Sequence, residues 1–169
     1  AGGIQFSGWL SSGNSGTNDV FVIAFDPNGN VQWGVNGSSS HDSRGVALEY
    51  IGTEVVVTGQ FGTSPLTFYD NLGNTPLASL TPLGGDDIFI LSISSSGTLN
   101  WRRKIGGASD DRVGGITCLG PNFYLTGGIG DAGTFPSIAG TYGSGFHQSF
   151  FISRHEVANG NTDWVEVIN

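Results

Sequence analysis

Methionine is absent from this 169-residue sequence, cysteine occurs once, and only 12% of the residues are charged. Helices are typically rich in Ala, Leu, Glu and Lys, whereas this chain has 29 glycines and 11 phenylalanines. That composition favours short strands joined by tight turns. A chain of this length forms one well-packed domain or a few repeat units. We therefore expect a single all-β domain.

Basic residues and long apolar runs are also scarce. The 6 Lys and Arg are outnumbered by 14 Asp and Glu, which gives a pI near 4.4, so the chain repels phosphate backbones and anionic lipid surfaces. No apolar run has the length that spans a bilayer. We expect neither a nucleic-acid partner nor membrane insertion. The start without Met suits a processed, secreted protein or a piece of a longer one.

The single cysteine, Cys118, cannot form a disulfide within the chain. It lies in the alternating segment GITCLG, where a small buried hydrophobic residue is expected more than a reactive thiol. Cysteine usage therefore leaves the redox compartment open.

The sequence contains an internal repeat. With Asp19 set on Asp87, residues 19–59 align with residues 87–127 without a gap. A third, partial copy follows in the segment QSFFISRHEVANGNTDW, and the segment IQFSG near the start resembles the VVVTG that ends the first unit. The nine identities among the 41 aligned positions are Asp19/Asp87, Phe21/Phe89, Gly29/Gly97, Trp33/Trp101, Asp42/Asp110, Arg44/Arg112, Gly52/Gly120, Thr58/Thr126 and Gly59/Gly127.

Each unit shows the period-2 patterns of strands. In the first unit, residues 20–25 and 30–33 flank the turn DPNG, and residues 44–52 and 54–59 follow as a second hairpin. Four short antiparallel strands, repeated about every 40 residues plus a variable connector, are typical of a β-propeller blade. The connector 60–86 contains further alternating segments. The predicted domain has four parts: partial unit 1–18, unit 19–86, unit 87–147 and partial unit 148–169.

The pattern of these units resembles a known repeat. It runs from GGDDIFI through a turn glycine and a Trp to the segment GGASDDR and then to YLTG. This order is similar to the bacterial β-propeller repeat called the SBBP repeat, common in large secreted and surface proteins of Bacteroidetes-type bacteria, and it covers almost the whole chain. The segment AFDPNGNVQW is more weakly similar to the repeat of quinoprotein-like propellers. The resemblance implies a secreted, non-catalytic scaffold or binding module.

The units at the two ends are incomplete. Closed propellers have about four to eight blades, whereas this chain encodes two nearly complete units and two partial ones. It is therefore a fragment, an open unit, or a unit that closes between chains. The carboxyl end supplies a first hairpin and the amino end a last strand, and unpaired strand edges pair readily with other chains. Head-to-tail pairing of this kind gives a ring or a filament.

Two sets of residues recur at fixed positions of the repeat, and a structural role is expected for both. A recurring Trp is typical of an indole that packs between blades and donates its N–H to a backbone carbonyl. A recurring Asp-x-Arg is typical of a loop tied to its neighbour by a charge-assisted hydrogen bond. The residues are Trp33, Trp101 and Trp164, with the pairs Asp42 and Arg44, and Asp110 and Arg112.

The sequence offers little for catalysis or metal binding. The three histidines stand apart, without Cys or a second His at metal-ligand spacing, and neither G-x-S-x-G nor H-E-x-x-H occurs. Hard oxygen ligands near Gly-rich turns leave Ca²⁺ open as a cofactor, although the spacing of a calcium-binding loop is absent. We expect no enzyme activity, no catalytic residue and no other cofactor. The carboxylates concerned are Asp86, Asp87, Asp110 and Asp111.

The one basic run of this acidic chain is residues 102–104, Arg-Arg-Lys. We expect it to form a solvated strand face. The alternative is that it docks an acidic patch on another subunit.

Together these observations favour a non-catalytic β-propeller-type module that is secreted or located at the cell surface. Its expected partners are other proteins or copies of itself, joined by strand pairing of the incomplete terminal units. The alternative is a lectin-like, carbohydrate-binding propeller that presents connector aromatics as stacking platforms, and a third hypothesis is an enzyme or quinoprotein-like domain. The aromatics of the carbohydrate alternative are Trp9, Tyr69, Tyr142 and Phe146.

Overall fold

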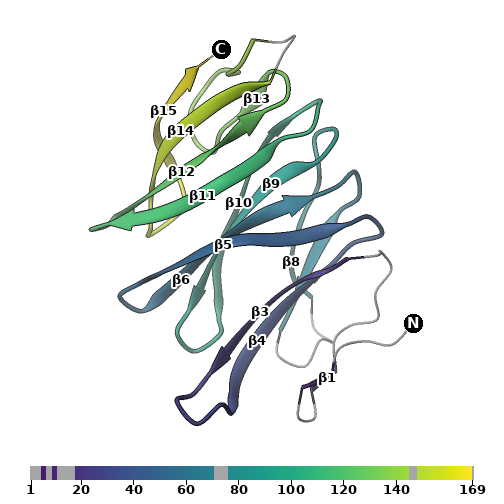
Figure 1. Ribbon diagram of the computed structural model, residues 1–169, viewed down its shortest axis with the longest axis vertical. Coiled ribbons are helices and arrows are strands. Elements are labelled where there is room, and N and C mark those ends of the chain that lie inside the picture. The colour runs from purple at the N-terminus through teal and green to yellow at the C-terminus, as the bar shows by residue number, and fades with distance from the viewer. Residues whose placement is uncertain (1–4, 7–8, 11–17, 71–75, 145–147, 169) are drawn as a thin grey trace.

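The computed structural model describes residues 5–6, 9–10, 18–70, 76–144 and 148–168. The predicted all-β class is confirmed, because the described residues form strands, turns and loops without a helix (Figure 1). Two short strands near the amino end, β1 (Gln5–Phe6) and β2 (Trp9–Leu10), pair with each other. The other described strands form three antiparallel sheets.

We number the sheets in the order in which the chain enters them. In the order of their paired strands, the first sheet contains β3 (Val20–Phe25), β4 (Val31–Ser38), β7 (Leu66–Tyr69) and β8 (Pro76–Leu80). The second contains β13 (Gly133–Thr134), β10 (Leu99–Gly107), β9 (Asp87–Ser94), β6 (Glu54–Phe61) and β5 (Ser43–Ile51). The third contains β11 (Arg112–Leu119), β12 (Asn122–Ile129), β14 (Ser149–Glu156) and β15 (Thr162–Ile168).

The sheets are offset from the predicted units by half a unit. In the second sheet, β6 of one unit pairs with β9 of the next unit along its whole length. In the third sheet, β12 pairs with β14 in the same way. The expectation that residues 20–59 form one four-stranded blade is therefore wrong, because β3 and β4 lie in the first sheet, and β5 and β6 lie in the second.

A contact between a glycine and an aromatic ring explains this pairing. Gly59 near the end of β6 lies against Phe89 of β9, and a Cβ on Gly59 would lie 2.5 Å from the phenyl ring. Gly127 and Phe151 repeat the contact in the third sheet, at 2.6 Å. Only glycine leaves room for the ring there. The Thr-Gly end of each unit therefore receives the first strand of the following unit.

The connector between β6 and β9 contributes strands of its own. β7 pairs with β4, and β8 pairs with β7, so the first sheet has its four strands. In the second sheet, β13 takes the corresponding place beside β10. The alternating segments of the connector 60–86 thus form the outer part of the first sheet.

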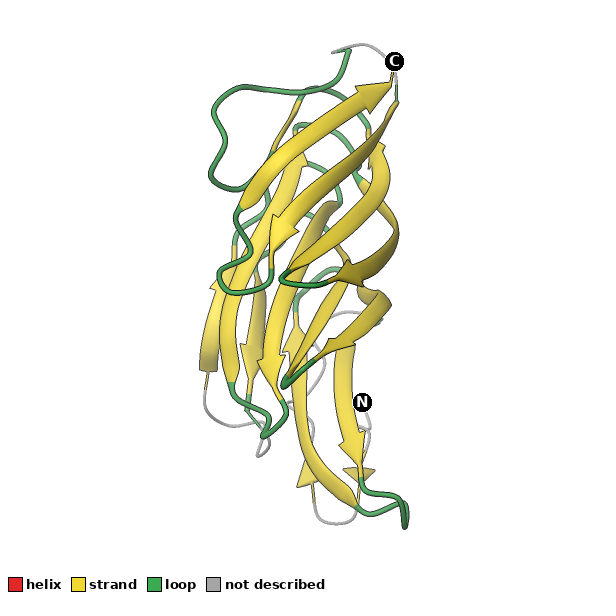
Figure 2. Cartoon of the chain, turned by 90° about the vertical axis from the view of Figure 1, so that its left-hand side faces the viewer, coloured by secondary structure: helices red, strands yellow, loops and turns green. Residues whose placement is uncertain are grey.

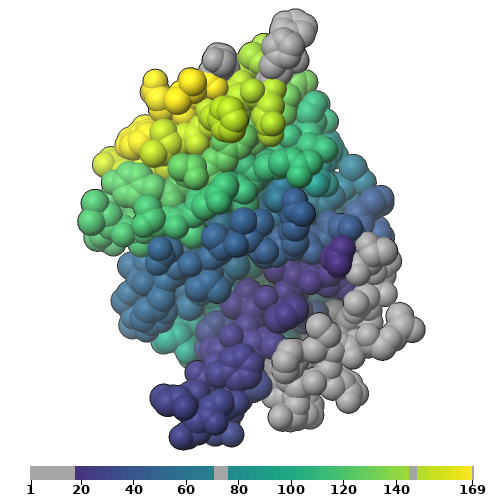
Figure 3. Space-filling view, viewed as in Figure 1, coloured from purple at the N-terminus to yellow at the C-terminus, as the bar shows by residue number. Residues whose placement is uncertain are grey.

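The sheets are stacked in chain order along the long axis of the molecule (Figure 1, Figure 3). Figure 2 shows the same stack after a quarter turn about that axis. We call the face that a sheet turns toward the next sheet its forward face, and the opposite face its rear face. In the third sheet, the forward face is the one that points away from the second sheet. Successive side chains of a strand point to opposite faces, so β9 in the middle of the stack is buried on both. Within the described residues, the three sheets do not close into a ring.

Two hydrophobic cores hold this stack together. Each fully buried side chain of this kind contributes about 1.5–3 kcal/mol, which makes the packing of one sheet on the next the main source of stability. Between the first and second sheets lie Val20, Val22, Trp33, Val35, Val57, Phe61, Leu66, Phe68, Phe89, Leu91 and Ile93. Between the second and third sheets lie Val56, Ile88, Ile90, Trp101, Ile105, Val113, Phe123, Leu125, Ile129, Phe135, Phe151 and Val157.

Candidate functional site

The forward face of the third sheet carries exposed apolar side chains. Phe150 is 67% exposed and Ile168 is 66% exposed, and with Ile152 they line a hollow of about 530 Å³. Phe150 pairs with Ile168 in the register in which Ile88 pairs with Ile105 in the second sheet. Both of those isoleucines are fully buried in the core beneath the third sheet. The same positions are therefore core in one sheet and surface in the next.

The lining of this hollow is mostly apolar. Three glycines, Gly114, Gly127 and Gly128, expose backbone where side chains would otherwise fill the space, and Arg112 and Gln148 lie among the polar residues of the lining. Exposed apolar patches of this type mark contact sites for proteins, membranes or ligands. The third sheet thus presents a face that is suited to burial.

Trp164 of β15 lies on the same face. It occupies the repeat position of Trp33 and Trp101, which are both buried and hydrogen-bonded to backbone carbonyls of the following sheet. Trp164 is instead 38% exposed, and its ring lies edge-on to that of Tyr124 at a centroid distance of 6.3 Å. No further sheet follows the third among the described residues, so the environment of this Trp differs from that of the other two.

The rear face of the first sheet shows the same contrast at the opposite end of the stack. Phe25 is 55% exposed, whereas Ile93, at the same position of the second sheet, is fully buried. Phe21 is also half exposed, and its counterpart Phe89 is fully buried. Both ends of the stack therefore carry apolar side chains at positions that form core inside it.

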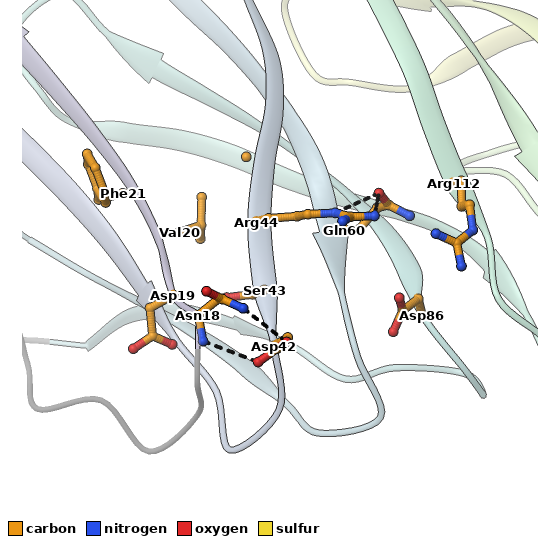
Figure 4. A pocket seen from close by; sticks show the side chains of 11 residues that line it. Asn18, Asp19, Val20, Phe21, Asp42, Ser43, Arg44, Gln60, Asp86 and Arg112 are labelled. Atoms are coloured by element: carbon orange, nitrogen blue, oxygen red, sulfur yellow. Dashed lines mark hydrogen bonds between the residues drawn. The ribbon is translucent and has the colours of Figure 1, made fainter. Parts of the chain in front are cut away.

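A polar pocket of about 670 Å³ lies between strands β3, β5 and β11 of the three sheets (Figure 4). Asp42 accepts hydrogen bonds from the backbone N–H and the side-chain amide of Asn18, at 3.2 and 3.1 Å. Arg44 donates from Nε and Nη2 to Oε1 of Gln60, at 3.2 and 2.9 Å. These two recurring residues thus hold two different segments of the chain.

Gln60 and Arg112 extend this network to the third sheet. The buried Gln60 donates from Nε2 to the carbonyl oxygen of Asp111 at 3.0 Å. Arg112 Nη2 lies 3.7 Å from Oδ2 of Asp110, and the backbone N–H of Asp86 donates to Oδ1 of Asp110 at 3.1 Å. Because both side chains of the Asp110–Arg112 pair are more than half exposed, the pair contributes little to stability. The second Asp-x-Arg pair therefore joins the start of β11 to the loop before β9.

The other two carboxylates of the Ca²⁺ hypothesis are buried and bind backbone N–H groups. Asp111 accepts hydrogen bonds from Gly107 and Gly130, at 2.7 and 2.9 Å, and burial raises its pKa to about 6. Asp87 accepts one from Leu83 at 2.7 Å, and burial raises its pKa as well. In the part of the chain that the structure describes, no three Asp, Glu, His or Cys side chains gather into a group that could hold a metal ion.

The basic run on β10 links neighbouring sheets. Arg102 donates from Nε to the carbonyl oxygen of Ser79 at 3.0 Å, toward the first sheet. Arg103 donates from Nη2 to Oδ1 of Asn161 at 3.2 Å, toward the third sheet. Arg102 is exposed, as expected for a solvated strand face, and Arg103 is partly buried, and both also form hydrogen bonds between sheets.

The aromatic residues of the carbohydrate hypothesis lie on different elements. Tyr69 belongs to β7 of the first sheet, and Tyr142 forms a bridge with β13 of the second. Tyr142 packs edge-on against Phe135 with ring centroids 5.5 Å apart. The side chain of Trp9 and the whole of Phe146 lie outside the described residues. Carbohydrate binding stays a prediction.

Sequence reasoning missed the exposed apolar positions Phe150, Ile152 and Ile168. Their signal was present, because the third copy keeps the apolar pattern of the first strand of each unit.

Cys118 is partly buried, and burial raises the pKa of its thiol to about 11. That pKa fits the predicted hydrophobic role better than a reactive thiol.

No family model and no curated protein matches this sequence. In its described residues, the structure is that of an all-β protein with three antiparallel sheets of four, five and four strands. It assigns the chain to no family, and the likeness to the SBBP repeat rests on the motif residues alone. Among the described residues, none forms a helix that is long and apolar enough to cross a membrane.

Proposed function

We propose that this protein is a non-catalytic β-propeller-type module of a secreted or cell-surface protein, and that it acts in protein–protein interaction or self-assembly. The observation that carries this proposal is the forward face of the third sheet. Phe150, Ile152 and Ile168 are exposed there at positions that form buried core in the second sheet. A surface with the side chains of a core is suited to burial against another protein.

The energetics favour this face over the polar pocket as the binding surface. Fully burying an exposed Phe or Ile side chain contributes about 1.5–3 kcal/mol. Because Phe150, Ile152 and Ile168 are already partly buried, each supplies only part of that free energy toward association. The exposed charges of the pocket contribute about 0–1 kcal/mol for each ion pair. Its best placed guanidinium, on Arg44, already donates to Gln60.

The contact we propose is made by a sheet face. The sequence predicts pairing of the incomplete terminal strands between chains, but a composite sheet built in that way would be one strand short. Packing of sheet on sheet requires no missing strand, and the chain already uses it twice between its own sheets. Face packing therefore takes the place of strand pairing in the proposal.

The proposal is tested with a variant that makes this face polar. We expect the unaltered chain to associate in light scattering, with and without Ca²⁺, and we expect Phe150→Ser with Ile168→Thr to abolish that association. Leu48→Ser is the control, because Leu48 is also exposed but lies on β5, away from the face. Equal association of the unaltered chain and the double variant would contradict the proposal.

A further inference from the structure

The two internal junctions between sheets share one hydrogen bond. Trp33 of the first sheet donates its indole N–H to the carbonyl oxygen of Ser95, in the β9–β10 turn of the second sheet, at 2.8 Å. Trp101 of the second sheet donates to the carbonyl oxygen of Val157, in the β14–β15 turn of the third, also at 2.8 Å. Each of these two sheets thus reaches forward to the equivalent hairpin turn of the next sheet, β9–β10 or β14–β15.

Each buried Trp also lies against a glycine of that turn. Gly97 has φ +87° and Gly160 has φ +71°, a left-handed conformation that favours glycine. A Cβ on Gly97 would lie 2.7 Å from the Trp33 side chain, and one on Gly160 would lie 2.6 Å from Trp101. The turn glycine therefore makes the space in which the indole docks.

The β3–β4 turn of the first sheet is built in the same way. Asp26 N donates to Asn30 O at 2.8 Å and Gly29 N donates to Asp26 O at 3.0 Å, which repeats the bonds of the β9–β10 turn. Gly29 has φ +84°, and no atom lies within 4 Å of a Cβ placed on it. Pro27 stands where the other turns have Ser95 and Val157. The first sheet thus carries an indole-docking turn that Trp33, Trp101 and Trp164, the Trp residues whose side chains the structure describes, do not occupy.

The apolar surfaces at the two ends match in the same manner. Inside the stack, forward-face residues such as Ile88 and Ile105 pack on rear-face residues of the next sheet. At the ends, Phe150 and Ile168 are the exposed forward-face positions, and Phe25 is an exposed rear-face position. One end of the chain therefore has the forward half of the junction, and the other end has the rear half.

We infer that the partner of the third sheet is the first sheet of a second copy of this chain, joined head to tail. Trp164 of one copy donates its indole N–H to the carbonyl oxygen of Pro27 in the next copy and lies against Gly29. Phe150 and Ile168 lie in the same contact against the rear face of that sheet, on which Phe21 and Phe25 are exposed. This inference rests on the proposed function and names the partner of that face. Because the two surfaces differ, the contact is heterologous, and it yields a ring if the rotation closes and a filament if it does not.

Two blocking variants test the head-to-tail arrangement. Phe25→Asp blocks the rear face of the first sheet, and Ile168→Asp blocks the forward face of the third. Both side chains are more than half exposed, so unchanged melting temperatures are the check on folding. We expect each variant alone to stay monomeric in sedimentation velocity where the unaltered chain associates. An equimolar mixture should form a particle of twice the 17.6 kDa monomer mass, because one free face of each kind remains.

A glycine pair tests the docking of the indole. Gly29 and Gly52 both have positive φ, +84° and +60°, and both have open space around a Cβ, so an Ala strains the backbone similarly at either position. We expect Gly29→Ala to weaken association by about tenfold or more, because its methyl group occupies the place of the indole. Gly52→Ala, in the β5–β6 turn, should leave the association constant unchanged.

The outcomes separate the inference from the proposed function. If the Phe25→Asp variant alone still associates as strongly as the unaltered chain, the forward faces bind something other than the first sheet. That result overturns the head-to-tail inference while the interaction function stands. If the unaltered chain is monomeric at every concentration, self-assembly is excluded and the inference is overturned with it.

Discussion

Equivalent residues of this repeat differ in environment according to the sheet that contains them. The sequence predicts an indole-to-carbonyl hydrogen bond for all three recurring Trp residues, and the structure shows it for Trp33 and Trp101 but not for Trp164. The pattern of residue types is identical at these positions. What differs is whether another sheet lies in front, and no property of the residue itself encodes that.

We predict that the Trp hydrogen bonds stabilise the stack. Trp33→Phe removes the part-buried hydrogen bond to the carbonyl oxygen of Ser95, and a hydrogen bond of this type contributes about 0.5–1.5 kcal/mol. Trp164→Phe is the matched control, since Trp164 is partly exposed and should change the free energy of unfolding of the dilute chain little. Urea denaturation at low protein concentration measures both. Equal losses in the two variants would contradict the assignment.

His155 makes the stability of the fold depend on pH. It is fully buried and stacks on Phe123 with ring centroids 4.8 Å apart, and its ring nitrogens contact the hydroxyl groups of Ser153 and Thr162 at 2.8 and 3.2 Å. Burial lowers its pKa to about 4, whereas an unfolded His has a pKa of about 6.5. Below pH 6.5 a proton binds to His155 in the unfolded chain but not in the folded one. The free energy of unfolding therefore has its full value above pH 6.5 and falls as the pH is lowered from 6.5 to 4.

We predict that His155→Ile removes this pH dependence. Ile93 occupies the corresponding position of the second sheet, so the substitution follows the chain's own repeat. Between pH 7 and pH 5, the unfolding free energy of the unaltered chain should fall by about 2 kcal/mol more than that of the variant. Urea denaturation at the two pH values measures this difference, and parallel changes would contradict it.

Asp111 acts in the opposite direction over part of the same range. Burial raises its pKa to about 6, so its buried charge costs stability above pH 6 and that cost disappears as the pH falls from 6 to about 3.8. The effect is present with and without His155. It therefore cancels when the two chains are compared, and the difference between them reports His155.

At the scale of strands, the period-2 pattern predicts most elements but not how they pair. Residues 20–25 form a strand with the expected bounds, and the second hairpin, predicted at 44–52 and 54–59, is found as β5 and β6 with shifts of at most two residues. The pairing of β6 with β9 joins strands separated by a long connector, which periodicity within one strand does not encode. The contacts of Gly59 with Phe89 and of Gly127 with Phe151 determine this pairing. An alignment of the repeat shows that these residues recur, but it does not show that they face each other.

We predict that this junction between units is intolerant of a single methyl group. On Gly59 a Cβ would lie 2.0 Å from the carbonyl oxygen of Arg44 and 2.5 Å from the Phe89 ring, so Gly59→Ala should cost about 3 kcal/mol or more. Gly115→Ala is the control, because its nearest neighbour, Thr126 Oγ1, lies 3.9 Å away. Thermal unfolding compares the two variants. A Gly59→Ala protein as stable as the control would contradict the assigned contact.

At the scale of the whole molecule, the stack has two different apolar ends. The forward face of the third sheet and the rear face of the first sheet are the two halves of a junction that occurs twice inside the chain. The sequence indicates the incomplete end units, from which strand pairing between chains is predicted. It does not reveal the exposed faces, because exposure depends on how the sheets stack and not on the residues of one strand.

The central claim is that these end faces join copies of the chain to one another, and the most direct test is the mass of the unaltered particle as a function of concentration. Sedimentation equilibrium should show the average mass rising above the 17.6 kDa of one chain as concentration increases. Because the chain carries a net charge of −8, added salt should strengthen the association by screening repulsion between copies. A mass of one chain at every protein and salt concentration would contradict the account.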